Sequence, residues 1–167
     1  MRRKVIVQNN ELLDDVAKMV SSGKRVILLT KGRSMLPFIV GGEDSVELSK
    51  IDGEISIGDI LLAKLTTPTP HYIIHRVIEI DGDRITLMGD GNLIGSEECH
   101  RKDIVARITS IIKRNRRRIN PNSKRQQRYA QIWQKLQPIR RYLLAIMRRI
   151  KLYSKTLNFR NFNQLSN

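Results

Sequence analysis

The alternation of apolar and polar residues divides the chain into an amphipathic helix, a series of short strands and a second amphipathic helix. Residues 11–20 carry apolar side chains at helical spacing, with acids in the first turn and Gly23 just past the end. This spacing predicts a helix that covers the core. Strands are expected over apolar or alternating stretches at residues 25–30, 45–48, 60–65, 72–80, 84–88 and 104–112.

The turn residues between these stretches support a β-rich fold. Asp81-Gly82-Asp83 separates two strand-like stretches and predicts a hairpin, and residues 66–70 contain two prolines and predict a loop. Several short strands behind one leading helix indicate a mainly β domain, either a compact barrel or a folded sheet. We expect this domain to span residues 1–112.

The remaining residues, 113–167, predict a basic linker and an amphipathic helical tail. The linker covers residues 114–124, and the helix is expected over residues 125–155. Pro138 is expected to kink this helix or to divide it in two. Steps of three and four residues define one apolar stripe: Ile132, Leu136, Ile139, Leu143, Ile146, Ile150 and Tyr153.

Charge is distributed very unevenly between the two regions. Residues 1–112 hold 15 basic and 16 acidic side chains, whereas residues 113–167 hold 16 basic side chains and no acidic one. Tails of this composition bind anionic partners. Three alternatives remain open: an anionic membrane surface, packing on the body or on a partner helix, and nucleic acid. For membrane or anion binding the candidate residues are Trp133, Arg140, Arg141, Arg148 and Arg149.

Composition excludes several other classes of site. Cys99 is the only cysteine, so the chain has no internal disulfide, and its neighbour His100 should point away from it on a strand. No metal and no cofactor are expected, because the chain shows neither zinc-ligand spacing nor a glycine-rich phosphate loop. No apolar run approaches the roughly 18 residues of a spanning helix. We therefore expect a cytoplasmic or peripheral membrane protein, on the cytoplasmic face.

Three short motifs supply the groups of a serine protease. Ser34 follows the apolar residues 26–29 and precedes a proline, His75 lies within an apolar stretch, and Asp90 lies in a Gly-Asp-Gly-Asn turn. Serine is a weak nucleophile until a base removes its proton, and histidine titrates near neutral pH. We expect His75 to act as that base and Asp90 to orient it, with the backbone N–H of Ser34 as an oxyanion donor.

The order of these motifs resembles the signal-peptidase and repressor-autopeptidase superfamily, most closely the archaeal and endoplasmic-reticulum signal peptidases. The matching segments are Ser34-Met35-Leu36-Pro37, His75-Arg76-Val77 and Gly89-Asp90-Gly91-Asn92, and the resemblance covers residues 26–112. It implies a signal-peptidase-like fold and a serine endopeptidase with a Ser34/His75 dyad. It also implies that Met35 lines the substrate pocket. Related bacterial enzymes use lysine as the base, so His75 fits the histidine-using branch.

The chain departs from this family in two respects. The family has a second aspartate shortly after the Gly-Asp-x-Asn box, where this sequence has Ser96, Glu97 and Glu98. Either a glutamate replaces it or Asp90 serves alone. The family is also anchored by an N-terminal transmembrane helix, for which we see no apolar run here. We therefore expect a signal-like or leader peptide as substrate, cleaved in solution or at a membrane surface, with the basic tail as anchor.

A second hypothesis belongs to a different class of protein. A chain that keeps the autopeptidase fold without catalysis would be a regulatory module that binds nucleic acid through its basic tail. Repressors of this superfamily carry an N-terminal DNA-binding domain. The roughly 25 residues before the first expected strand are too few for a helix-turn-helix domain, which argues against a repressor.

Overall fold

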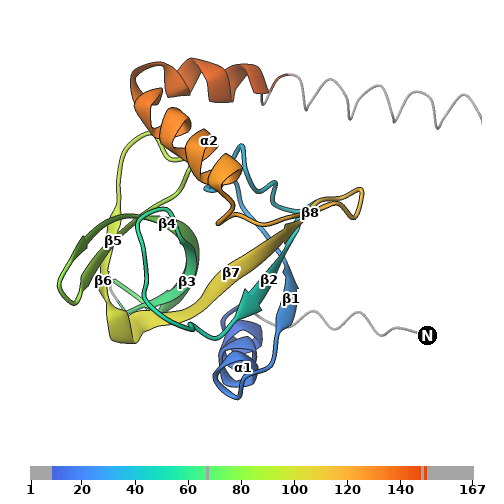
Figure 1. Cartoon of the computed structure of the whole chain (residues 1–167), viewed down its shortest axis with the longest axis vertical. Helices are drawn as coiled ribbons and strands as arrows, with labels where there is room; N and C mark the ends of the chain where they lie inside the picture. The colour runs from blue at the N-terminus through green and yellow to red at the C-terminus, as the bar shows by residue number, and fades with distance from the viewer. Residues whose placement is uncertain (1–8, 67, 148, 150–167) are drawn as a thin grey trace, which may run out of the picture.

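The computed structural model describes residues 9–66, 68–147 and 149, and it is mainly β (Figure 1). A short helix precedes a curled antiparallel sheet, and two helices follow it. The elements are α1 (Asn9–Ser21), β1 (Val26–Leu29), β2 (Ser45–Ser49), β3 (Ile60–Leu65), β4 (His71–Asp81), β5 (Arg84–Met88), β6 (Glu97–His100), the single-turn helix η1 (Arg101–Asp103), β7 (Ile104–Ile112), β8 (Arg118–Ile119) and α2 (Lys124–Lys135). Helix resumes over residues 137–147, and we call this stretch and α2 the helical pair.

The sheet has the strand order β1-β2-β7-β3-β4-β5-β6, with β8 paired to β7. Every pairing is antiparallel. The register shifts within β2, β3 and β4, and such bulges bend a strand and increase its twist. The sheet therefore curls into a half-barrel, with β1 and β6 as its edges (Figure 1).

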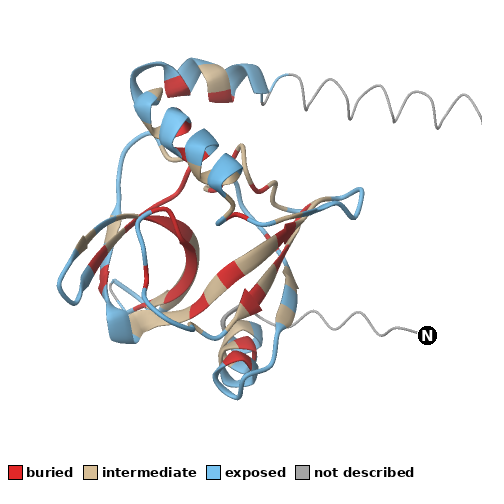
Figure 2. Ribbon diagram, viewed as in Figure 1, coloured by how far each residue is buried: buried red, intermediate tan, exposed pale blue. Residues whose placement is uncertain are grey.

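Strand β3 lies at the centre of this sheet and is buried on both faces. Ile60 and Leu62 join a core cluster that includes Val16 and Val20 of α1. Leu61 and Ala63 point the other way, into a second cluster with residues of β4 and β5. Alternate side chains of a strand face opposite sides of the sheet, so burial on both sides requires a continuous apolar run (Figure 2).

Most of the predicted elements are present. The helix predicted over residues 11–20 and all six predicted strands occur within a residue or two of the expected bounds, and residues 81–83 form the hairpin turn. Strands β6 and β8 were not predicted. Strand β8 lies inside the expected linker and folds back on β7, so that region is partly structured.

The C-terminal helix is divided, as predicted, with the break at Leu136, two residues before Pro138. The inner face consists of Ala130, Trp133, Arg140 and Leu144, which are almost fully buried, and Trp133 and Leu144 pack with Leu36 of the body. The predicted apolar stripe is split between two environments, because Leu136 and Leu143 pack against this cluster, whereas Ile132, Ile139 and Ile146 are about half exposed. Residues 150–155 of the predicted helix, with Ile150 and Tyr153, lie outside the described residues.

Candidate active site

Ser34 lies in a turn between β1 and β2 whose two ends are fastened together. Gly42 N–H donates to the carbonyl of Thr30 (2.8 Å), and Thr30 donates through both its N–H and its hydroxyl to the carbonyl of Asp44. The Asp44 carboxylate accepts from Val40 N–H and from the Lys113 ammonium, at 2.8 and 2.7 Å. These bonds hold the residue 32–41 turn against β7, so Ser34 sits on a fixed loop.

His75 lies on β4 and lines the same cavity as Ser34. This cavity has a volume of about 370 Å³ and lies between α1, β1 and the first half of β4. His75 is almost completely buried, at 5% exposed. Because both residues line one cavity, a hydroxyl and an imidazole are candidates to act on the same bound molecule.

The carboxylate beside His75 is Glu97 of β6. Its Oε2 lies 2.8 Å from His75 Nδ1, and its side chain is about one-third exposed. When Nδ1 carries the proton and donates it to this carboxylate, Nε2 is left as a proton acceptor. The structure thus pairs His75 with a glutamate carboxylate, in the cavity that Ser34 also lines.

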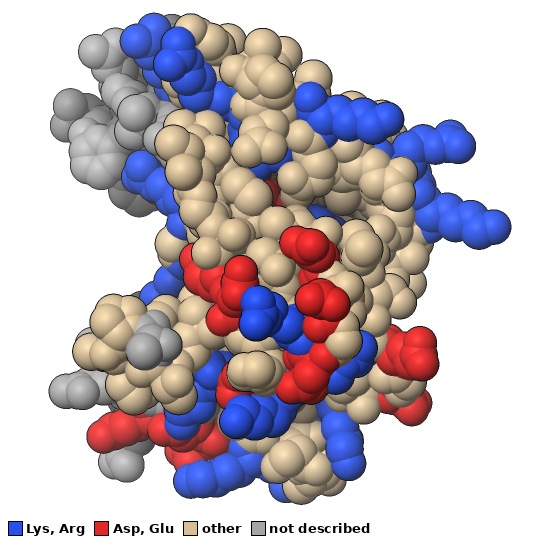
Figure 3. All heavy atoms as spheres, turned by 90° about the vertical axis from the view of Figure 1, so that its left-hand side faces the viewer, with Lys and Arg blue, Asp and Glu red and all other residues tan. Residues whose placement is uncertain are grey.

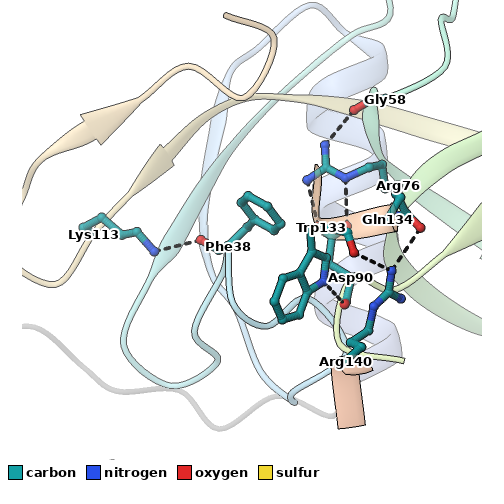
Figure 4. A network of polar contacts seen from close by, with 8 residues as sticks. All are labelled: Phe38, Gly58, Arg76, Asp90, Lys113, Trp133, Gln134 and Arg140. Carbon is teal, nitrogen blue, oxygen red and sulfur yellow. Dashed lines mark hydrogen bonds and ion pairs between the residues drawn. The ribbon is translucent and has the colours of Figure 1, made fainter. Parts of the chain in front are cut away.

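Asp90 does not fill that position, contrary to the sequence-based expectation. It is completely buried, and its two carboxylate oxygens accept from Arg76 Nε and Nη2 at 2.9 and 2.7 Å (Figure 4). Arg76 also donates to the carbonyl of Gly58. His75 and Arg76 are consecutive strand residues and point to opposite faces, so a group paired with Arg76 lies on the face away from His75. Asp90 is a structural and positioning residue.

The Asp90 turn lies directly under the Ser34 backbone. Gly91 N–H donates to the carbonyl of Ser34 at 2.6 Å. A Cβ at Gly89 would lie 2.5 Å from that carbonyl oxygen, and one at Gly91 would lie 2.6 Å from the carbonyl oxygen of Arg33. Only glycine leaves enough room at these two positions, so residues 89–92 hold the Ser34 segment by backbone contact.

The helical pair closes over this turn. Trp133 Nε1 donates to the carbonyl of Asp90 at 2.6 Å, and Arg140 donates to the carbonyl of Trp133 (Figure 4). Arg140 also donates to the carbonyl of Asn92, at 3.0 Å. Burial lowers the pKa of the Arg140 guanidinium, an effect that the nearby Asp90 charge opposes. Neither Trp133 nor Arg140 is free to contact a membrane or an anion, which corrects the sequence-based assignment. Arg141 and Arg149 are exposed, and Arg148 lies outside the described residues.

The cavity is lined by both apolar and polar residues. Met35 lines it and is also part of the core, at 5% exposed. Helix α1 contributes Leu12 and Leu13, so this helix is more than the core cover that its sequence predicted. Asp14 of the same helix accepts from Lys64 and from the cavity residue Tyr72, and these two hydrogen bonds lower the pKa of the Asp14 carboxyl. Sequence reasoning missed this cluster because its members are 50 and 58 residues apart.

The remaining histidines have other partners. His71 Nδ1 lies 2.7 Å from the carbonyl of Thr69 at the cavity mouth, and exposed His100 pairs with Asp83 at 3.0 Å. Within the ranges that the structure describes, no group of three His, Cys, Asp or Glu side chains is arranged to hold a metal ion. In the same ranges, no helix combines the length and the apolar character needed to cross a bilayer.

Cys99 is expected to be unreactive in the folded protein. Its side chain is 6% exposed, and burial raises the pKa of its thiol to about 11. At about pH 8 the thiolate fraction is then roughly a hundredth of that in the unfolded chain, so iodoacetamide should label the native protein about 100-fold more slowly. Mass spectrometry with and without denaturant measures both rates. Equal rates would contradict the buried position of Cys99.

The site was also compared with known proteins. No protein-family model matches the chain, and no curated protein is significantly similar to it in sequence. The function of the chain is therefore inferred from its motifs and from the geometry of the cavity.

Proposed function

We propose that the protein is a serine endopeptidase in which Ser34 is the nucleophile, His75 the general base and acid, and Glu97 the residue that orients the imidazole. The observation that carries this proposal is the shared cavity of Ser34 and His75, with Glu97 Oε2 2.8 Å from His75 Nδ1. A buried imidazole fixed by a carboxylate, in one cavity with a loop serine, is the set of groups that activates a hydroxyl for acyl transfer.

The proposed reaction follows from these three groups. His75 Nε2 accepts the Ser34 hydroxyl proton as Oγ attacks the scissile carbonyl carbon, and the Ser34 N–H stabilises the oxyanion. The tetrahedral intermediate then expels the amine, which takes the proton from His75 and leaves an acyl-enzyme. Water, deprotonated by His75, hydrolyses that ester and restores Ser34. Glu97 stabilises the imidazolium formed in each half of the reaction.

An extended peptide is the substrate that fits the cavity. Strand β1 is an edge strand, and residues 71–75 of β4 pair with β3 alone among the described strands. Both border the cavity, so each offers unpaired backbone groups to a substrate strand. The apolar lining from Leu28, Leu62 and Ile74 favours the apolar segment of a signal-like or leader peptide.

The test is a comparison of protein N-termini in source cells that carry the wild-type chain or Ser34→Ala. We expect a set of new N-termini that disappears with Ser34→Ala, because the substitution removes the attacking hydroxyl. Ser22→Ala is the matched control, since it removes an exposed hydroxyl at the end of α1. Identical N-terminal maps from wild type and Ser34→Ala, with both proteins folded and abundant, would refute the proposal.

A further inference from the structure

The outer face of the helical pair carries large apolar side chains that its own packing does not use. The pair is fixed to the body by Trp133, Arg140 and Leu144 on its inner face. The outer side chains are between 44% and 55% exposed, and they define what we call the outer apolar face: Tyr129, Ile132, Ile139, Tyr142 and Ile146. Several exposed large apolar side chains on one pair of helices indicate a contact site for another molecule.

Basic side chains surround this outer apolar face. The exposed ones on the helical pair and its end are Lys124, Arg125, Arg128, Lys135, Arg141 and Arg149. From residue 113 onward the chain contains no acidic side chain. Figure 3 shows lysine and arginine over the upper part of the molecule, where the helices lie, and acidic side chains further down. The partner of the outer apolar face must therefore be negatively charged.

Two tyrosines connect the apolar and basic parts of the face. The Arg141 guanidinium carbon lies 4.5 Å from the centre of the Tyr142 ring, and that of Arg125 lies 5.5 Å from the Tyr129 ring. Tyrosine is amphipathic and, beside arginine, is typical of side chains at the boundary between lipid headgroups and acyl chains.

We propose that the outer apolar face docks on an anionic lipid surface, with the isoleucines among the acyl chains and the arginines on the headgroups. The exposed apolar side chains and the basic side chains together favour lipid over nucleic acid as the partner. Phosphates of a duplex would neutralise the cations but would leave Ile139 and Ile146 in water, whereas a bilayer surface accepts both. This inference goes beyond the proposed peptidase activity and does not depend on it.

Docking of this face would also fix the cavity relative to the lipid surface. Trp133 and Arg140 join the helical pair to the backbone of residues 90–92, and Gly91 N–H joins that turn to the carbonyl of Ser34. Hydrogen bonds of 2.6–3.0 Å therefore connect the helical pair to the Ser34 backbone. A membrane-bound molecule would therefore present Ser34 in one orientation to a substrate held at the same surface.

The test measures binding of the full chain to phosphatidylcholine vesicles with and without phosphatidylglycerol. We expect binding only when the anionic lipid is present. Replacing Ile139 and Ile146 together by glutamine keeps the net charge and should weaken that binding about tenfold or more. Arg141→Gln with Arg149→Gln should weaken it by a similar factor, because each surface arginine contributes to the attraction.

Two controls separate loss of docking from loss of structure. Ile27→Gln is the matched variant, since Ile27 on β1 is 56% exposed against 54% for Ile146, and it should bind as the wild type does. Trp133 is the only tryptophan in the chain, so its fluorescence reports directly whether the helical pair stays packed in each variant. A variant whose emission shifts to that of the unfolded chain is replaced by Tyr142→Ser, which should also weaken binding.

The outcomes are distinct. Absence of wild-type binding to anionic vesicles, or equal binding by the double isoleucine variant with Trp133 still buried, would overturn the proposal. Tighter binding to duplex DNA than to vesicles, unaffected by the isoleucine changes, would assign the face to nucleic acid instead. Ser34→Ala should bind vesicles as the wild type does, because the substitution leaves the outer apolar face unchanged. Vesicle binding therefore tests the docking proposal separately from the peptidase proposal.

Discussion

Asp90→Ala is expected to lower the free energy of unfolding by about 3–5 kcal/mol, because it leaves the buried Arg76 guanidinium without its counter-charge. Arg76 is 4% exposed and Asp90 is completely buried, and two hydrogen bonds join them. The substitution removes both bonds while the carbonyl that accepts from Trp133 remains. Denaturant unfolding followed by circular dichroism measures the difference.

A double variant serves as the control for this result. Arg76→Met combined with Asp90→Leu removes both charges and fills the space with apolar atoms, so it should recover much of the lost stability. If the double variant regains stability, the loss of unfolding free energy in Asp90→Ala is due to the unpaired charge of Arg76. A value for Asp90→Ala within about 0.5 kcal/mol of wild type, as for an ordinary surface change, would contradict the buried pair.

Glu97→Gln is expected to reduce the rate of peptide cleavage by a factor of about 100 to 10,000 with little change in stability. The amide of glutamine can donate to His75 Nδ1, which favours the tautomer with the proton on Nε2 and removes the base that Ser34 requires. Glu97 is about one-third exposed, so the fold depends on it far less than on Asp90. The measurement is kcat on a peptide that spans a cleavage site identified from the N-terminal map.

The neighbouring glutamate provides the matched control. Glu98 belongs to the same strand, and its carboxylate lies 3.8 Å from exposed Arg84 instead of His75. Glu98→Gln should therefore cleave at the wild-type rate. Wild-type cleavage by Glu97→Gln would exclude the proposed role of this residue and would leave His75 to act without a carboxylate partner.

The sequence predicted the central strands well because burial leaves a simple pattern. Strand β3 is apolar on both faces, and its predicted and observed bounds are identical. Strand β6 was missed because it has a single apolar residue, Cys99, and lies at the edge of the sheet with β5 as its partner. Pairing of such a strand depends on its neighbour's backbone, which a local pattern does not contain.

The candidate site was predictable in part. Ser34 and His75 carried recognisable flanking residues, and both line the cavity. The choice between Asp90 and Glu97 was not predictable, because Arg76 is a competing partner next to His75 on β4. Which carboxylate reaches which residue depends on the face of the strand that each one approaches, and that is a property of the sheet.

The helical tail shows why an apolar stripe does not by itself identify the packed face of a helix. Here the packed face includes Arg140, whereas Ile132, Ile139 and Ile146 of the stripe are about half exposed. A buried arginine is stable there because carbonyls of Asn92 and Trp133 accept its hydrogen bonds. The periodicity of the helix sequence contains no information about hydrogen-bond acceptors that a distant turn supplies.

Because Gly89 and Gly91 are crowded, the positions of this turn differ greatly in the amino-acid substitutions that they tolerate. A single added methyl group at either position would meet a backbone oxygen of the serine segment, which has no side-chain rotamer with which to yield. Three residues after Gly91, Ile94 is 92% exposed and has almost no steric constraint. In homologues of this chain, the presence of both glycines would indicate that the residue 32–41 turn has kept its shape. This would hold even where the surrounding surface residues have all been replaced.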